Sequence, residues 1–130
     1  MIVADASAMV EALIGRDVND DLLDALSGDI DAPHLLDAEV LSVLRGLVLG
    51  NKLDVAVAER ARRDHFAFAV SRHEAGPFAE RIWALRHQFT SYDACYLALA
   101  EALDAPLWTC DAKLATAGHG ADVRLVRRSH

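Results

Sequence analysis

The chain has 130 residues, a formal net charge of −7 and a hydrophobic content of 53%. This length suits one domain with a single sizeable core. The acidic balance argues against a general nucleic-acid-binding protein, because such proteins contact phosphates through basic surfaces. No apolar run is long enough to span a bilayer, and the N-terminal segment lacks the positive start of a signal peptide. We therefore expect one cytoplasmic domain over residues 1–130, without membrane contact.

The first half of the chain predicts one strand and four helices. Residues 1–5, MIVAD, are a short β-branched run that ends in an acid, which indicates a buried strand. Helices are predicted where apolar residues recur with helical spacing between capping residues and glycines. They cover residues 7–15, 19–28, 35–50 and 54–66. Residues 30–34, IDAPH, are predicted as a turn around Pro33.

The second half predicts three more strands among further helices. The predicted strands are residues 67–72, 106–110 and 123–126, and the predicted helices are residues 76–89, 91–103 and 111–118. Strands that alternate with helices are typical of a parallel α/β sheet. We therefore expect a short parallel sheet of about four to five strands with helices on both faces. Cys95 and Cys110 form no metal-ligand pattern, so we interpret them as reduced thiols.

Four carboxylates occupy comparable positions in these elements. Asp5 ends the first strand, Asp111 follows the third, Asp93 opens a helix, and Glu39 lies early in the long helix. Ligands of an open parallel sheet bind at the carboxyl ends of its strands, where the strand order reverses. Converging carboxylates repel one another, and a divalent cation offsets that cost. Clustered carboxylate oxygens are suited to Mg²⁺ or Mn²⁺.

Each acid also has a purely structural interpretation. Asp5 and Asp111 can cap the helices that follow them, Asp93 can complete a capping box opened by Thr90, and Glu39 can be an exposed charge. For any one acid alone this interpretation is favoured. Taken together, the four acids share a type, a neighbourhood and apolar surroundings, which favours a metal site.

Four segments at these acids resemble the motifs of a known family. VADAS at 3–7, LDAEVLSVL at 36–44, SYDACYLALAEAL at 91–103 and LWTCDAKLA at 107–115 resemble the four motifs of PIN-domain ribonucleases. The length and the order of elements are similar to those of VapC-type toxins from bacterial toxin–antitoxin pairs. The resemblance covers essentially the whole chain.

The resemblance implies a PIN-like fold and a Mg²⁺- or Mn²⁺-dependent endoribonuclease that uses a metal-activated water. It implies that Asp5, Glu39, Asp93 and Asp111 are the catalytic and metal-binding acids. Ser7 and Thr109 match small hydroxyl positions that support these acids. Beside the last acid, where the family often has a further polar residue, this chain has an alanine. The implied partners are an RNA substrate, a VapB-type antitoxin and a second copy of the chain.

Basic and apolar residues indicate where these partners bind. Given the acidic net charge, RNA contacts are expected from local basic residues: Arg45, Lys52, Arg86 and Lys113. The six histidines are interpreted as surface or loop residues. The long helix is apolar on two sides, which indicates burial on both. Its second stripe and the short second helix are predicted to face a partner through Leu41, Leu44, Val48, Leu22, Leu23 and Leu26.

Two other functions are considered beside the ribonuclease. A non-catalytic binding module with a PIN-like fold would not need the complete set of four acids. A response-regulator receiver domain would need an acid pair after the first strand, a phosphoacceptor Asp that ends a central strand, and a Lys at a later strand end. The first strand is followed by a single acid, and the segment at 67–72 contains no Asp.

Overall fold

The computed structural model describes residues 1–130 and has a five-stranded sheet, six α-helices and two 3-10 helices. The strands are β1 (Ile2–Ala4), β2 (Ile30–Pro33), β3 (Val70–His73), β4 (Leu107–Thr109) and β5 (Val123–Leu125). The helices are α1 (Ala6–Ile14), α2 (Asp20–Leu26), α3 (Leu35–Leu49), α4 (Val55–Ala67), η1 (Gly76–Phe78), α5 (Ala79–Ala84), α6 (Ser91–Leu103) and η2 (Ala112–Ala115). The predicted α/β class and the number of strands are confirmed.

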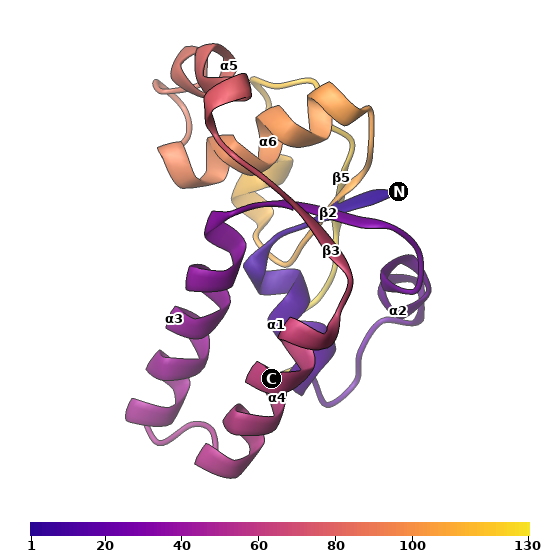
Figure 1. The fold of residues 1–130 in the computed structure, drawn as a ribbon, viewed down its shortest axis with the longest axis vertical. Coiled ribbons are helices and arrows are strands. Elements are labelled where there is room, and N and C mark those ends of the chain that lie inside the picture. The colour runs from indigo at the N-terminus through magenta and orange to yellow at the C-terminus, as the bar shows by residue number, and fades with distance from the viewer.

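All neighbouring strands run parallel, in the order β3-β2-β1-β4-β5. The chain moves outward from β1 to β3 and then returns to the other side of β1 through β4. Right-handed crossovers made in opposite directions put their helices on opposite faces of a sheet. Accordingly, α1, α3 and α4 lie below the sheet in Figure 1, and α5 and α6 lie above it. The strand order reverses between β1 and β4, so a ligand site is expected at the carboxyl ends of these two strands.

The core lies between the sheet and these two helical layers. β1 is buried along its whole length, and α6 covers the sheet with a run of buried small and aliphatic residues. The core cluster contains 27 buried residues. Both cysteines are free thiols, as predicted. No helix is long and apolar enough to cross a membrane.

Several predicted boundaries were wrong. Residues 30–33 form the buried strand β2 instead of a turn, because Pro33 is the last residue of the strand and its missing N–H falls at the end of the ladder. The strand predicted at 67–72 begins only at Val70, since α4 continues to Ala67. The helices predicted at 76–89 and 111–118 shorten to η1 with α5 and to η2.

The interpretation of all histidines as surface residues was also wrong. The His65 side chain on α4 is fully buried, and its Nε2 lies 2.8 Å from Asp37 Oδ1 on α3. Arg72 on β3 donates to the same carboxylate from Nε at 2.7 Å and from Nη2 at 3.0 Å. A buried polar side chain needs such partners. The network therefore joins α3, α4 and β3, which the sequence pattern alone did not connect.

Asp37 provides a test of this network. Burial raises the pKa of its carboxyl, but hydrogen bonds from Arg72 and His65 and the charges of both residues lower it more, so the net pKa lies below the ordinary value. A carboxyl with a depressed pKa stabilises the fold above its unfolded pKa, roughly 3.9, and this stability is lost as the pH falls through the folded value. Asp37→Asn should therefore lower the free energy of unfolding at neutral pH by about 1–3 kcal/mol.

The measurement is urea unfolding of the variant and the wild type at neutral pH and at successively lower pH. The difference between them should shrink as the pH falls through the depressed pKa of Asp37, because the wild-type carboxyl is then protonated as well. Asp64→Asn is the matched control, because Asp64 lies on α4, is exposed and forms no ion pair. An equal loss of stability at every pH would contradict the network.

Candidate metal centre

The four predicted acids line one cleft of about 480 Å³ where the strand order reverses. Asp5 directly follows β1, and Asp111 lies two residues after β4. Glu39 reaches the cleft from α3, and Asp93 reaches it from the first turn of α6. The complete lining is Asp5, Ala6, Ser7, Glu39, Asp93, Tyr96, Cys110, Asp111, Ala112 and Arg128.

Asp5 is the most firmly held of the four acids and is only 6% exposed. Its Oδ1 accepts from Ala8 N at 2.9 Å, so it is the N-cap of α1, and also from the Ser7 hydroxyl at 2.7 Å. Its Oδ2 accepts from the Thr109 hydroxyl at 2.5 Å. The capping role considered for Asp5 is therefore real, and it coexists with a position in the cleft.

Ser7 and Thr109 connect the ends of β1 and β4. The Ser7 hydroxyl donates to Asp5 and accepts from Cys110 N at 2.8 Å. The Thr109 hydroxyl likewise donates to Asp5 and accepts from Asp111 N at 2.9 Å. These hydrogen bonds fix the backbone of Asp111 beside Asp5.

Glu39 is half-buried rather than an exposed charge. Its Oε1 accepts from the Tyr96 hydroxyl at 2.6 Å. Tyr96 was not among the predicted site residues, but its position three residues after Asp93 was an available signal. Residues at this spacing share one face of a helix, so Tyr96 follows Asp93 towards the cleft.

Asp93 and Asp111 each take part in a helix cap and also line the cleft. The Thr90 hydroxyl accepts from Asp93 N at 3.1 Å, which makes Thr90 the N-cap of α6. Asp111 caps η2 by accepting from Lys113 N at 3.0 Å. The Lys113 ammonium lies 3.8 Å from Asp93 Oδ2. Lys113, predicted as an RNA contact, is therefore paired with one of the acids.

Folding makes the charged forms of three acids less favourable. Burial raises the pKa of Asp5 and the Asp111 charge adds to this, although hydrogen bonds from Thr109, Ser7 and Ala8 oppose it. Burial and the charges of Asp5 and Asp93 raise the pKa of Glu39 against the hydrogen bond from Tyr96. The pKa of Asp93 is raised by burial and by Asp111, against Lys113 and Thr90. A cation in the cleft would relieve this repulsion.

The chemistry of the lining fits a hard cation. The charged side chains that could ligate a metal here are all carboxylates, which suit Mg²⁺ and Mn²⁺. Burial, followed by nearby negative charges, raises the pKa of Cys110 to about 11, so its sulfur is a protonated thiol instead of a thiolate ligand. As they stand, no three His, Cys, Asp or Glu side chains lie close enough together to hold a metal ion.

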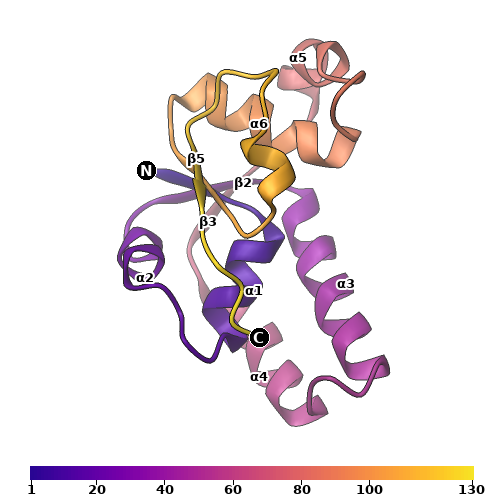
Figure 2. The same cartoon turned by 180° about the vertical axis from the view of Figure 1, so that it is seen from behind.

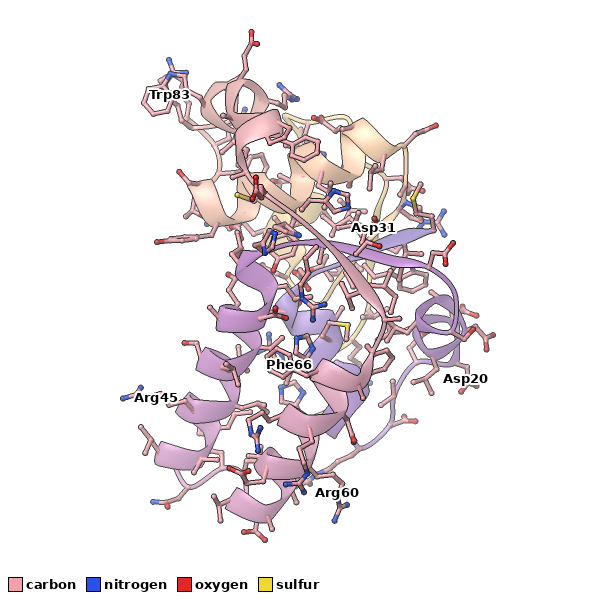
Figure 3. All side chains as sticks on the ribbon, in the orientation of Figure 1. Asp20, Asp31, Arg45, Arg60, Phe66 and Trp83 are labelled. Carbon is pink, nitrogen blue, oxygen red and sulfur yellow. The ribbon has the colours of Figure 1, made fainter.

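The predicted basic residues do not gather at this cleft. Arg45 points outward from α3 and lines a separate groove (Figure 3). Arg86 donates to Trp83 O at 3.0 Å and lies over the Trp83 ring. Lys52, in the turn after α3, is also absent from the lining. Arg128 does line the cleft, and sequence reasoning missed it because no motif surrounds it.

Comparisons with known proteins agree with this architecture. The model of the PIN domain family matches residues 2–120. Over 130 residues the chain is 43% identical to ribonuclease VapC1 of Mycobacterium tuberculosis, covering 96% of this chain and 97% of that protein.

Solved structures share the fold at low sequence identity. PAE2754 from Pyrobaculum aerophilum has a TM-score of 0.70 at 22% identity, covering 93% of this chain and 87% of that one. VapC20 of Mycobacterium tuberculosis, described as a sarcin-ricin loop cleaving toxin, has a TM-score of 0.64 at 14% identity, covering 92% and 97%. A toxin–antitoxin complex from Klebsiella pneumoniae has a TM-score of 0.55 at 20% identity, covering 87% and 88%. With the family match and the identity to VapC1, the chain belongs to the PIN-domain family, in its VapC group.

Proposed function

We propose that this protein is a Mg²⁺- or Mn²⁺-dependent endoribonuclease that acts as the toxin of a type II toxin–antitoxin module. The observation that carries the proposal is the convergence of Asp5, Glu39, Asp93 and Asp111 on one cleft at the strand-order reversal. The names of two relatives, ribonuclease VapC1 and the cleaving toxin VapC20, support RNA as the substrate.

In this mechanism Asp5, Glu39, Asp93 and Asp111 would hold the cation, and the fold positions these four carboxylates. When bound, Mg²⁺ or Mn²⁺ would lower the pKa of a water and stabilise the charge that develops on the scissile phosphodiester. The hydroxyls of Ser7 and Thr109 fix both oxygens of Asp5, and the Tyr96 hydroxyl orients Glu39. Such supporting hydrogen bonds keep ligating oxygens in place. The chemistry requires no protein nucleophile, which agrees with the protonated state of Cys110.

The first prediction separates the catalytic role of the acids from their structural roles. Asn is as good an N-cap as Asp, so Asp5→Asn and Asp111→Asn keep the caps while removing a charged ligand. Asp5→Asn, Glu39→Gln, Asp93→Asn and Asp111→Asn should each reduce RNA cleavage by about 100-fold or more. The measurement is the cleavage rate of end-labelled RNA with Mg²⁺ or Mn²⁺, beside circular dichroism of each variant.

Glu74→Gln is the matched control, because Glu74 is exposed, forms no ion pair and lies outside the cleft. It should cleave RNA at the wild-type rate, and EDTA should abolish cleavage by both proteins. The assignment of the site fails if two or more of the four cleft variants keep wild-type cleavage. A wild-type protein that binds RNA and cuts none in either metal would instead be a binding module.

The second prediction concerns metal and stability. A cation that binds only the folded protein raises the melting temperature by mass action. At a cation concentration of about 100 times Kd, the free energy of unfolding rises by about 2.7 kcal/mol. The rise should be smaller under mildly acidic conditions, because folding raises the pKa of three of the acids and protonated carboxyls bind metal weakly. The measurement is thermal unfolding across a Mg²⁺ titration. A wild-type response no larger than that of Asp93→Asn would count against the site.

The partner surface differs from the one predicted from the sequence. Leu22, Leu26 and Leu44 belong to the core and are at most 5% exposed. Of the other predicted residues, Leu41 and Val48 line a groove of about 230 Å³ between α3 and α4. It is lined by Leu41, Leu44, Arg45, Val48, Leu49, Val55, Ala58, Glu59 and Arg62.

We assign this groove to an amphipathic segment of the antitoxin, as a helix-in-groove contact. The relationship to VapC proteins and the fold shared with a toxin–antitoxin complex support such a partner. Arg62 pairs with Glu59 at 2.8 Å, whereas Arg45 forms no ion pair. An acidic residue on the antitoxin segment would therefore complement Arg45.

The third prediction uses Leu41, which is 39% exposed on the groove wall. Leu41→Asp should weaken antitoxin binding by about tenfold or more, because it puts a charge in an apolar contact, and should leave RNA cleavage unchanged. Leu23→Asp on α2 is the matched control, with an exposed leucine outside the groove. The measurement is calorimetric titration with the antitoxin encoded beside this gene. Equal affinity of both variants would exclude the groove, and loss of a dimer in Leu41→Asp alone would assign it to a second copy.

A further inference from the structure

The last residues of the chain pass directly beside the candidate metal centre. Val126 is buried after β5, and its N–H donates to Thr109 O at 2.8 Å. Thr109 in turn donates to Asp5, so this point of the tail is one residue away from a cleft acid. The tail then runs down to α1 and ends beside it (Figure 2). Arg128 follows this first anchor by two residues.

A second anchor follows Arg128 immediately. The Glu11 side chain on α1 is fully buried and accepts from Ser129 N at 2.7 Å, from the Ser129 hydroxyl and from His130 Nδ1 at 3.0 Å. Ser129 is also held from the other side, because its carbonyl accepts from Arg16 N at 3.3 Å and its hydroxyl accepts from Asp17 N at 3.0 Å. A carboxylate is buried at high cost unless it is hydrogen-bonded in this way.

The contact between the end of the chain and α1 depends on Gly15 and on the charge of Glu11. A Cβ at Gly15 would collide with the Glu11 carboxylate, so this glycine gives the carboxylate its room. Burial raises the pKa of Glu11, but the hydrogen bonds from Ser129 and His130 lower it more, and the net pKa lies below the ordinary value. Glu11 is therefore charged at neutral pH. We call its hydrogen bonds with Ser129 and His130 the tail clamp, or clamp for short.

Between the two anchors, Arg128 is the only Lys or Arg that lines the cleft. It is exposed and forms no ion pair or side-chain hydrogen bond, whereas nearby Lys113 is paired with Asp93. Arg127, its neighbour in the tail, lines a different cavity with Asp17, Val18, Asn19, Asp20 and Ser129. Of these two adjacent arginines, only Arg128 lines the acidic cleft.

We propose that Arg128 binds a phosphate of the RNA strand next to the scissile phosphodiester, and that Glu11 is a positioning residue that holds Arg128 there through the tail. This proposal rests on the proposed ribonuclease function. A strand entering a cleft lined by four carboxylates needs a cation that is not already neutralised by them. A free guanidinium meets this need, because it can donate two parallel hydrogen bonds to one phosphate.

The test compares Arg128→Ala and Arg128→Lys with the matched control Arg127→Ala. Arg128→Ala should raise KM for RNA by about tenfold and leave kcat within about twofold, because it removes a charged hydrogen bond to the neighbouring phosphate and none to the scissile one. The slope of log Kd against log salt, measured in the Glu39→Gln background so that the RNA is not cut, should fall by about one, the value of one phosphate contact. Arg128→Lys keeps the charge but loses the paired hydrogen bonds, so it should recover only part of the affinity, and Arg127→Ala should match the wild type.

The positioning role of Glu11 is tested with Glu11→Met combined with Ser129→Ala. This pair removes the clamp without leaving a buried carboxylate unpaired. It should raise KM about as much as Arg128→Ala, and adding Arg128→Ala to it should have little further effect, since both changes remove one contact. A merely structural role would instead give additive losses.

The outcomes are distinguishable from a failure of the proposed function. Wild-type protein that neither binds nor cuts RNA overturns both proposals. Wild-type protein that cuts RNA, with Arg128→Ala equal to Arg127→Ala in KM and in salt slope, overturns only the role of Arg128. Faster cleavage by Arg128→Ala would also overturn it, because the guanidinium would then be competing with the metal for the carboxylates.

Discussion

The arrangement of the site depends on the hydrogen bonds that join Asp5 to the end of β4. Two hydroxyls, from Ser7 and Thr109, donate to its two carboxylate oxygens and at the same time accept the backbone N–H groups of Cys110 and Asp111. β1 and β4 are neighbours only because the strand order reverses between them. These hydrogen bonds therefore join β1 to β4 where the strand order reverses and set the second strand-end acid beside the first, while Asp5 also caps α1. Parallel sheets concentrate ligand sites at such a reversal for this reason.

Five of the carboxylates in this protein form two groups, in which folding shifts the pKa in opposite directions. Asp5, Glu39 and Asp93 line the cleft, and burial with mutual repulsion raises the pKa of each. Glu11 and Asp37 are paired with donors, which lower their pKa values despite burial. A carboxylate that folding satisfies is part of the scaffold, whereas one that folding leaves in need of a counter-charge is a candidate for ligand binding.

The scaffold acids lie outside the cleft and hold elements that carry its side chains. Asp37 ties α3 to α4 and β3, two residues before Glu39 on the same helix. Glu11 ties the end of the chain to α1, the helix that Asp5 caps. Repulsion within the cleft thus acts against elements that are separately anchored by ion pairs and hydrogen bonds. In the proposed metal site, this anchoring would hold the ligating oxygens in place when a cation binds.

The sequence by itself determined the class of fold and the four acids. Strand and helix periods alternate clearly enough to indicate a parallel sheet, and acids placed after strands predict a shared edge. It misplaced β2 because Pro33 dominated the local pattern, and it could not reveal that His65 is buried, since that depends on a partner 28 residues away. The match to the PIN domain family over residues 2–120 and the identity to VapC1 leave a receiver domain without support.

Only the tertiary structure decided which basic residue belongs to the cleft. Arg128 has no motif, and its position follows from two anchors, at Thr109 and at Glu11, that are 19 and 117 residues away from it in the chain. Local patterns report on neighbours within a helix turn or a strand, whereas contacts between distant segments depend on the packing of the whole chain. The carboxylates could therefore be named from the sequence, and the cation beside them could not.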